Sequence, residues 1–88
     1  MHKQKAIAEI NEWKLNPQKV RFERLCAVAE VFGFRFSRQQ GSHKIYVQTE
    51  IAEILNFQNV GGKAKPYQVK QFIEILEKYK LMEGEDDV

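Results

Sequence analysis

Residues 33–48, GFRFSRQQGSHKIYVQ, hold the pattern that decides the fold. Apolar and polar residues alternate over Phe34–Ser37 and again over Lys44–Gln48, which is the two-residue period of a half-buried strand. The polar segment between them contains a glycine, as turns commonly do. The stretch therefore predicts a β-hairpin. We expect one face to carry Phe34, Phe36, Ile45 and Val47, and the other Arg35, Lys44, Tyr46 and Gln48.

His43 stands at the mouth of the second predicted strand. Strand parity groups it with Ile45 and Val47 and so favours an inward side chain, although the first residue after a turn often escapes the alternation. Near neutral pH a histidine can take a proton from one group and return it to another, which cleavage of RNA through its own 2′-hydroxyl requires. The alternative is a structural histidine that only hydrogen-bonds the turn.

Three amphipathic helices accompany the hairpin. The first covers residues 2–14 and ends before Pro17, the second begins between residues 17 and 22 and ends at Gly33, and the last begins at Pro66. Their apolar residues recur three to four positions apart. These positions are Ala6, Ile7, Ile10 and Trp13 in the first helix, Phe22, Leu25, Cys26, Val28, Ala29 and Phe32 in the second, and Val69, Phe72, Ile73 and Leu76 in the last.

A third strand is predicted at Ile54–Gln58, after a connection over residues 49–52 and before a flexible basic loop over residues 59–65. The order predicts an α+β fold in which a three-stranded antiparallel sheet carries helices on one face and leaves the other open to a ligand.

The expected organisation has three parts. Residues 1–16 form an N-terminal amphipathic helix, residues 17–82 the main domain, and residues 83–88 an acidic disordered tail.

The charge distribution favours a polyanionic partner. The 88 residues have a net charge of +2, but four of the 12 acidic residues lie in residues 83–88, so residues 1–82 carry 14 basic and 8 acidic groups. All charged residues in 33–48 and in 61–70 are Arg or Lys. Nucleic acid is the commonest partner of such a surface. A solvated basic face without a ligand is the alternative.

Several residues suit contacts with RNA. Gly41 and Ser42 would let a phosphate approach the His43 ring, and Tyr46 could stack on a base. The basic residues that could offset phosphate charge in the transition state are Arg35, Arg38, Lys44, Lys63 and Lys65. Gly61, Gly62 and Lys63 lack the following Ser or Thr of a nucleotide-binding loop, so a backbone-phosphate contact is the most they predict.

Other classes of site are not expected. Cys26 is the single cysteine and lies in an apolar stripe, so neither an intrachain disulfide nor a thiolate metal site is predicted. We expect no metal and no cofactor. No apolar run approaches the length of a membrane span, and no signal peptide is evident, so a cytoplasmic protein is expected.

Several segments together resemble the HicA-type toxins of bacterial toxin–antitoxin pairs. These are Leu25–Cys26 through Gly33–Phe34, the turn Arg38–His43, Ile45–Tyr46, and Gln58–Val69. The resemblance covers about residues 20–80. It implies a double-stranded-RNA-binding-like α-β-β-β-α fold, metal-independent cleavage of messenger RNA, and a HicB-type antitoxin that covers the active face.

By position, the family's catalytic histidine falls on His43, with Gly41 and Ser42 in the turn that presents it. Many members have a second histidine where this chain has Lys44, so whether Lys44 supplies a second acid or base stays open. A noncatalytic RNA-binding module is the first alternative. A protein-interaction domain, using the open sheet edge or the stripe of Ile7, Ile10 and Trp13, is the second.

Overall fold

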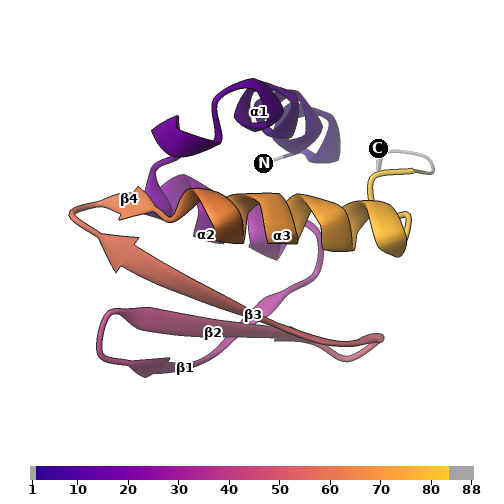
Figure 1. The fold of residues 1–88 in the computed structure, drawn as a ribbon. Helices are drawn as coiled ribbons and strands as arrows, with labels where there is room; N and C mark the ends of the chain where they lie inside the picture. The colour runs from indigo at the N-terminus through magenta and orange to yellow at the C-terminus, as the bar shows by residue number, and fades with distance from the viewer. Residues whose placement is uncertain (1, 84–88) are drawn as a thin grey trace.

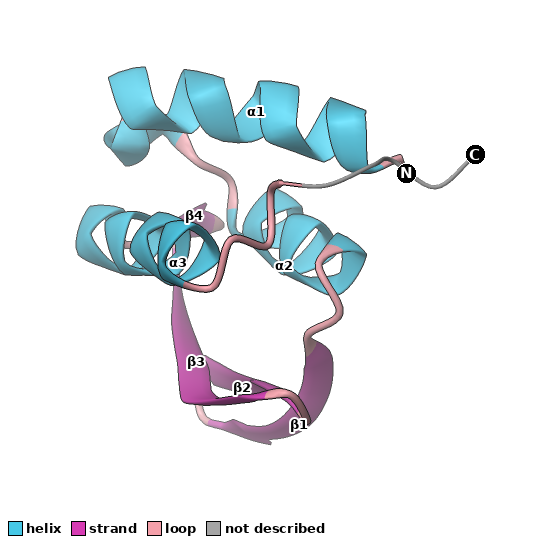
Figure 2. Ribbon diagram, turned by 90° about the vertical axis from the view of Figure 1, so that its right-hand side faces the viewer, coloured by secondary structure: helices cyan, strands magenta, loops and turns pink. Residues whose placement is uncertain are grey.

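The computed structural model describes residues 2–83 and arranges them in three layers (Figure 1). Helix α1 lies across α2 and α3, and these two helices lie on one face of a β-sheet (Figure 2). The elements are α1 Lys3–Leu15, the 3-10 turn η1 Pro17–Lys19, α2 Phe22–Val31, β1 Arg35–Gln40, β2 His43–Gln48, β3 Ile51–Val60, β4 Lys63–Ala64 and α3 Pro66–Lys78. The predicted α+β class is confirmed. Beyond Glu83, the expected acidic tail lies outside the described residues.

The sheet has four antiparallel strands in the order β1-β2-β3-β4, one more than expected. The expectation of a loop over residues 59–65 was wrong, because Val60 pairs with Lys63 through a two-residue hairpin. Gly61 and Gly62 both have positive φ, +59° and +88°, as the tight hairpin turns that match strand twist require. Strand β3 is also longer than predicted, since only residues 49–50 form the turn before it.

Aromatic side chains join the sheet to the helices. The Tyr46 ring from β2 lies 5.8 Å from the Phe57 ring of β3, and Phe57 meets Phe72 of α3 edge-on at 5.8 Å. Phe34 meets the same Phe72 ring at 6.1 Å. Such pairs contribute about 0.5–1.5 kcal/mol each beyond the burial of apolar area. Phe72 of α3 is therefore the shared partner in both edge-on contacts.

This cluster reverses the expected faces of β2. Tyr46 is only 3% exposed and faces the helices together with Lys44, whereas Ile45, Val47 and His43 share the outer face. The parity of the strand was predicted correctly, but the face assigned to each set was wrong. The aromatic ring of Tyr46 fills the space under the helices.

A bulge interrupts β1 between Phe36 and Arg38. Phe36 pairs with Tyr46 on the helix face, but Arg38 pairs with Ile45 on the outer face, because the extra residue shifts the alternation by one. All six residues of β1 are exposed, so it forms an open edge of the sheet.

The N-terminal helix packs on the molecule's own core. Ala6, Ile10 and Trp13 are buried, and Arg24 of α2 donates two hydrogen bonds to the Glu9 carboxylate at 2.8 and 2.7 Å. The stripe that was considered as a partner surface is therefore largely covered by α2 and α3. Within residues 2–83 no helix has the length and apolarity needed to cross a bilayer.

Gly33 ends α2 as predicted. Its φ is +93°, its N–H donates to the Glu30 carbonyl at 3.0 Å, and the Phe34 N–H donates to the Ala29 carbonyl at 3.1 Å. This pair of bonds defines the Schellman motif, in which glycine avoids the steric cost of left-handed backbone. The motif directs the chain from α2 into β1.

The same motif ends α3, but with Lys80 in the left-handed position at φ +56°. The Lys80 N–H donates to the Glu77 carbonyl at 3.2 Å, and the Leu81 N–H donates to the Leu76 carbonyl at 2.8 Å. A side chain at this φ is strained, whereas glycine is not.

We predict that Lys80→Gly raises the free energy of unfolding by about 0.5–1 kcal/mol, because relief of left-handed strain exceeds the added entropy of the unfolded chain. Urea denaturation followed by circular dichroism measures the change. Lys80→Ala is the matched control, since it removes the charge but keeps the strain. Equal stability of the glycine and alanine variants would contradict the prediction.

Candidate functional site

The candidate site is built around His43, the first residue of β2. Its half-buried ring lies on the outer face, with Nδ1 2.8 Å from the Asn56 Oδ1 atom of β3. An amide oxygen only accepts hydrogen bonds, so Nδ1 carries the hydrogen in this contact. In the neutral ring Nε2 is then unprotonated and can accept a proton.

The strands on either side complete the outer face around this ring. Gln40 of β1 and Gln58 of β3 are the pairing partners of His43. Two residues further along β2, Ile45 is flanked by Arg38 and Asn56, and it is only 5% exposed although no helix covers this face (Figure 2). The site thus has an apolar floor beside the histidine, with polar groups and one guanidinium around it.

The turn before His43 is held by side-chain hydrogen bonds. The Gln39 Nε2 atom donates to the Gly41 carbonyl at 3.0 Å, and the Gln58 Nε2 atom donates to Ser42 Oγ at 3.4 Å. The Asn59 N–H donates to the Ser42 carbonyl at 2.9 Å. Gly41 and Ser42 therefore lie at the end of the sheet next to His43, as the sequence predicts.

Lys44 lies on the opposite side of β2. Its Nζ atom is 5.8 Å from the ring centroids of both Phe22 and Phe36, under the start of α2. Because neighbouring residues of a strand point to opposite faces, the ammonium group is not beside the His43 ring. The structure does not bring these two candidate residues together on one face.

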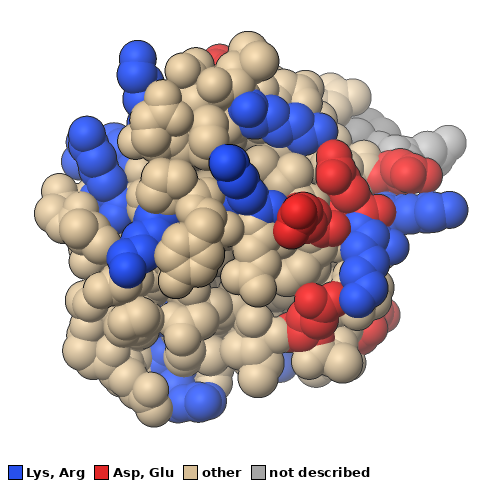
Figure 3. Space-filling view, viewed as in Figure 1, with Lys and Arg blue, Asp and Glu red and all other residues tan. Residues whose placement is uncertain are grey.

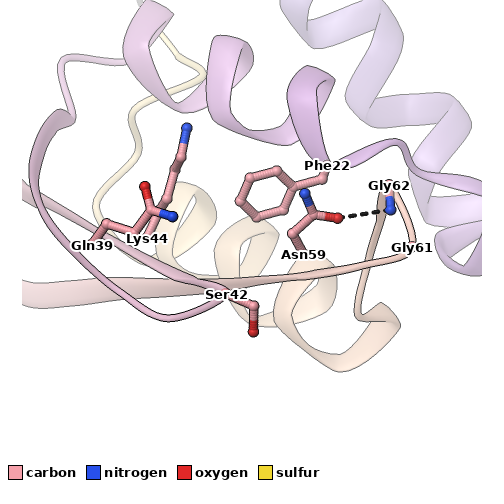
Figure 4. A pocket seen from close by; sticks show the side chains of 7 residues that line it. All are labelled: Phe22, Gln39, Ser42, Lys44, Asn59, Gly61 and Gly62. Atoms are coloured by element: carbon pink, nitrogen blue, oxygen red, sulfur yellow. Dashed lines mark hydrogen bonds between the residues drawn. The ribbon is translucent and has the colours of Figure 1, made fainter.

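A cleft of about 340 Å³ opens on this helix-facing side (Figure 4). Lys44 and Phe22 lie between β2 and α2, whereas the Ser42 hydroxyl points away from α2 (Figure 4). The cleft is lined by Phe22, Gln39, Ser42, Lys44, Asn59, Gly61 and Gly62. It therefore joins the β1–β2 turn to the β3–β4 turn.

The remaining predicted RNA contacts are spread over the molecule. Arg35 is exposed at the far end of β1, Lys63 is exposed on β4, and the Nζ atom of Lys65 lies 5.9 Å from the Tyr67 ring centroid. Tyr46 is buried, which is inconsistent with the expectation that its ring stacks on a base.

On the face shown in Figure 3, charge is distributed unevenly between the two ends of the molecule. Lys and Arg side chains cover the end where β4 and the beginning of α3 lie, whereas acidic side chains gather over the C-terminal half of α3 (Figure 3). At that acidic end, Lys14 pairs with Glu77 and Lys78 with Glu53, each at 3.0 Å. The hydrogen bond from Lys78 lowers the pKa of the Glu53 carboxyl. On this face, the end with β4 and the beginning of α3 is thus the more cationic one.

Asn56, Gln39 and Asn59 were missed as site residues. The alternation of Asn56 with Leu55 and Phe57 did indicate that it faces away from the core. Its contact with His43 depends on the register between β2 and β3, which the alternation does not determine. In the described part of the chain, no group of three or more His, Cys, Asp or Glu side chains is placed to hold a metal ion.

No family model, curated protein or solved structure matches this chain.

Cys26 lies under β2, where burial raises the pKa of its thiol despite a hydrogen bond with Tyr46. Burial and that same bond raise the pKa of the Tyr46 hydroxyl.

We predict that iodoacetamide modifies Cys26 several-fold more slowly in the native protein than in urea, with the rate rising only at higher pH, because the thiolate is the reactive form. Mass spectrometry measures the rates. Equal rates at equal pH would contradict a buried thiol.

Proposed function

We propose that this protein is an endoribonuclease of the HicA toxin type, which cleaves single-stranded regions of messenger RNA with His43 as general acid and base. The observation that carries the proposal is the hydrogen bond from His43 Nδ1 to Asn56. This bond leaves Nε2 as the proton acceptor on a sheet face that no helix covers.

The chemistry needs only the RNA and a proton carrier. Nε2 of His43 accepts the proton of a 2′-hydroxyl while that oxygen attacks the adjacent phosphorus. The bond from phosphorus to the 5′-oxygen breaks, and the imidazolium returns a proton to this leaving oxygen. The products are a 2′,3′-cyclic phosphate and a free 5′-hydroxyl. Because the nucleophile belongs to the RNA, this route requires no metal.

The surroundings of His43 favour a phosphate substrate. Arg38 lies on the same outer face, two residue pairs from His43, and its guanidinium can stabilise charge on the phosphorane-like transition state. The Gly41–Ser42 turn is exposed beside the ring, which leaves room for a sugar-phosphate backbone.

The finer assignments belong to the same proposal. The element order from α2 to α3 is compatible with an α-β-β-β-α domain of the double-stranded-RNA-binding type, extended by α1 and β4. Together with the resemblance in residues 20–80, this supports a toxin that acts in the cytoplasm and is neutralised by a HicB-type antitoxin. The open outer face is the surface that such an antitoxin would cover.

A noncatalytic RNA-binding module is the second candidate, and the same Asn56 contact favours it. A histidine already hydrogen-bonded across two strands has a structural role without catalysis. The two candidates differ in whether removal of the ring abolishes a reaction or only weakens binding.

We predict that the purified protein cleaves a long labelled RNA in the presence of chelator, and that His43→Ala lowers the rate on the order of 10²–10⁴-fold through loss of the general base. Gel electrophoresis measures cleavage, and enzymatic end analysis identifies the cyclic phosphate. The matched control is His2→Ala, which removes a histidine before α1.

The binding module is separated from the enzyme by the same assay. RNA that stays intact under the parent protein but shifts in a gel would contradict the ribonuclease. Cleavage that survives in His43→Ala, with its circular dichroism spectrum unchanged, would contradict the role of this ring.

Asn56 is predicted to act as a positioning residue. Asn56→Leu should lower kcat/KM about tenfold, because it removes the acceptor that orients His43. Asn56→Asp restores an acceptor, and its carboxylate favours the protonated ring, so we expect activity to return with its rise shifted to higher pH. Complete pH–rate profiles measure both effects. Identical profiles for the parent and Asn56→Asp would contradict the contact.

A further inference from the structure

We infer that one RNA strand passes around the end of the sheet, with the cleaved phosphate at His43 on the outer face and a flanking phosphate at Lys44 in the cleft on the helix-facing side. The strand then continues along a basic ridge, which we define as Lys19, Arg21, Lys63 and Lys65. The inference rests on the proposed function for the identity of the ligand, and its test separates the two.

Lys44 has the surroundings of an anion-binding group. Lys44 is a half-buried residue whose Nζ atom lies near two aromatic rings, and no carboxylate within residues 2–83 forms an ion pair with it. A partly desolvated cation that lacks a counter-charge is stabilised by binding an anion. The cleft in front of it is open to solvent and has room for one (Figure 4).

The ridge places like charges against each other. Arg21 and Lys63 are direct antiparallel bridge partners, and the Ala64 N–H donates to the Val20 carbonyl at 2.9 Å, which holds the two segments together. Like charges directly opposite each other across strands are destabilising. In residues 2–83, no acidic side chain forms a salt bridge with any member of the ridge. A polyanion would relieve this repulsion.

The cleft and the ridge form one continuous path. The Phe22 N–H donates to the Gly62 carbonyl at 3.0 Å, and these two cleft residues are the chain neighbours of Arg21 and Lys63. At the other end of the cleft, Ser42 directly precedes His43, and its hydroxyl accepts a hydrogen bond from Gln58, the β3 residue that pairs with His43. A flexible single strand can follow this bend, whereas a rigid duplex cannot contact both faces of one sheet end.

Binding is measured with a fluorescent 2′-deoxy single strand of about 12 nucleotides, within the usual range of single-strand site sizes. This probe cannot be cleaved through a 2′-hydroxyl. The variants are Lys44→Met and Arg21→Met, which keep the apolar stems, and Lys5→Met on α1 is the matched charge control. Each ridge or cleft variant should weaken binding several-fold and lower the salt slope by about 0.7, whereas the control should match the parent.

A second readout uses cleavable RNA of increasing length. For the parent protein, we expect kcat/KM to rise several-fold when the RNA is extended beyond a dinucleotide. Lys44→Met should remove most of this gain, because it should raise KM more than it lowers kcat. A length dependence that is unchanged in Lys44→Met would overturn the path around the sheet.

The outcomes separate this inference from the proposed function. Suppose that cleavage depends on His43 but that Lys44→Met and Arg21→Met leave binding and its salt slope unchanged. This result would overturn the path and would still support the ribonuclease. If the RNA is not cleaved but Lys44→Met and Arg21→Met still weaken binding and lower the salt slope, the ribonuclease is overturned and the binding path stands. Polyglutamate with the same number of charges as the strand serves as a competitor. If it binds as tightly as the strand and displaces it, the site is one for acidic peptides and the RNA path is overturned.

Discussion

The aromatic contact between the sheet and α3 is the constraint on which the rest of the structure depends. Tyr46 and Phe57 must face the helices to meet Phe72, and strand alternation then forces His43 and its neighbour on β3 to the opposite side. The exposure of the candidate catalytic ring therefore follows from core packing. A shift of the β2 register by one residue would bury the His43 imidazole and expose the Tyr46 ring. The packing energy of the aromatic cluster therefore opposes burial of His43.

Elements with local signals could be predicted from the sequence. The 3.6-residue period fixes three helices, and Gly33 marks the end of α2 because few residues adopt its left-handed backbone. The face of β2 was predicted wrongly because tyrosine is both apolar and polar, and hydropathy alone does not say which of two alternating sets enters the core. The short strand β4 has no period of its own and exists through pairing with β3 and with Arg21.

The candidate site divides in the same way. His43 could be identified from one chain because it is the sole histidine outside the N-terminal segment, in a turn context with only cationic charges. Its partner Asn56 lies 13 residues away and becomes visible only through the register of two strands. Lys44 is next to His43 in sequence but on the other face, so proximity in sequence was misleading. Because strand residues alternate between faces, His43 and Lys44 belong to two separate subsites.

The bulge in β1 has a consequence for association between molecules. An exposed edge strand with regular alternation is a template for intermolecular pairing. Here the extra residue between Phe36 and Arg38 breaks the regular hydrogen-bond ladder, and Arg35 and Arg38 place positive charge along this exposed edge. The bulge and these charges therefore oppose growth of the edge into a continuous intermolecular sheet, while the outer face stays open.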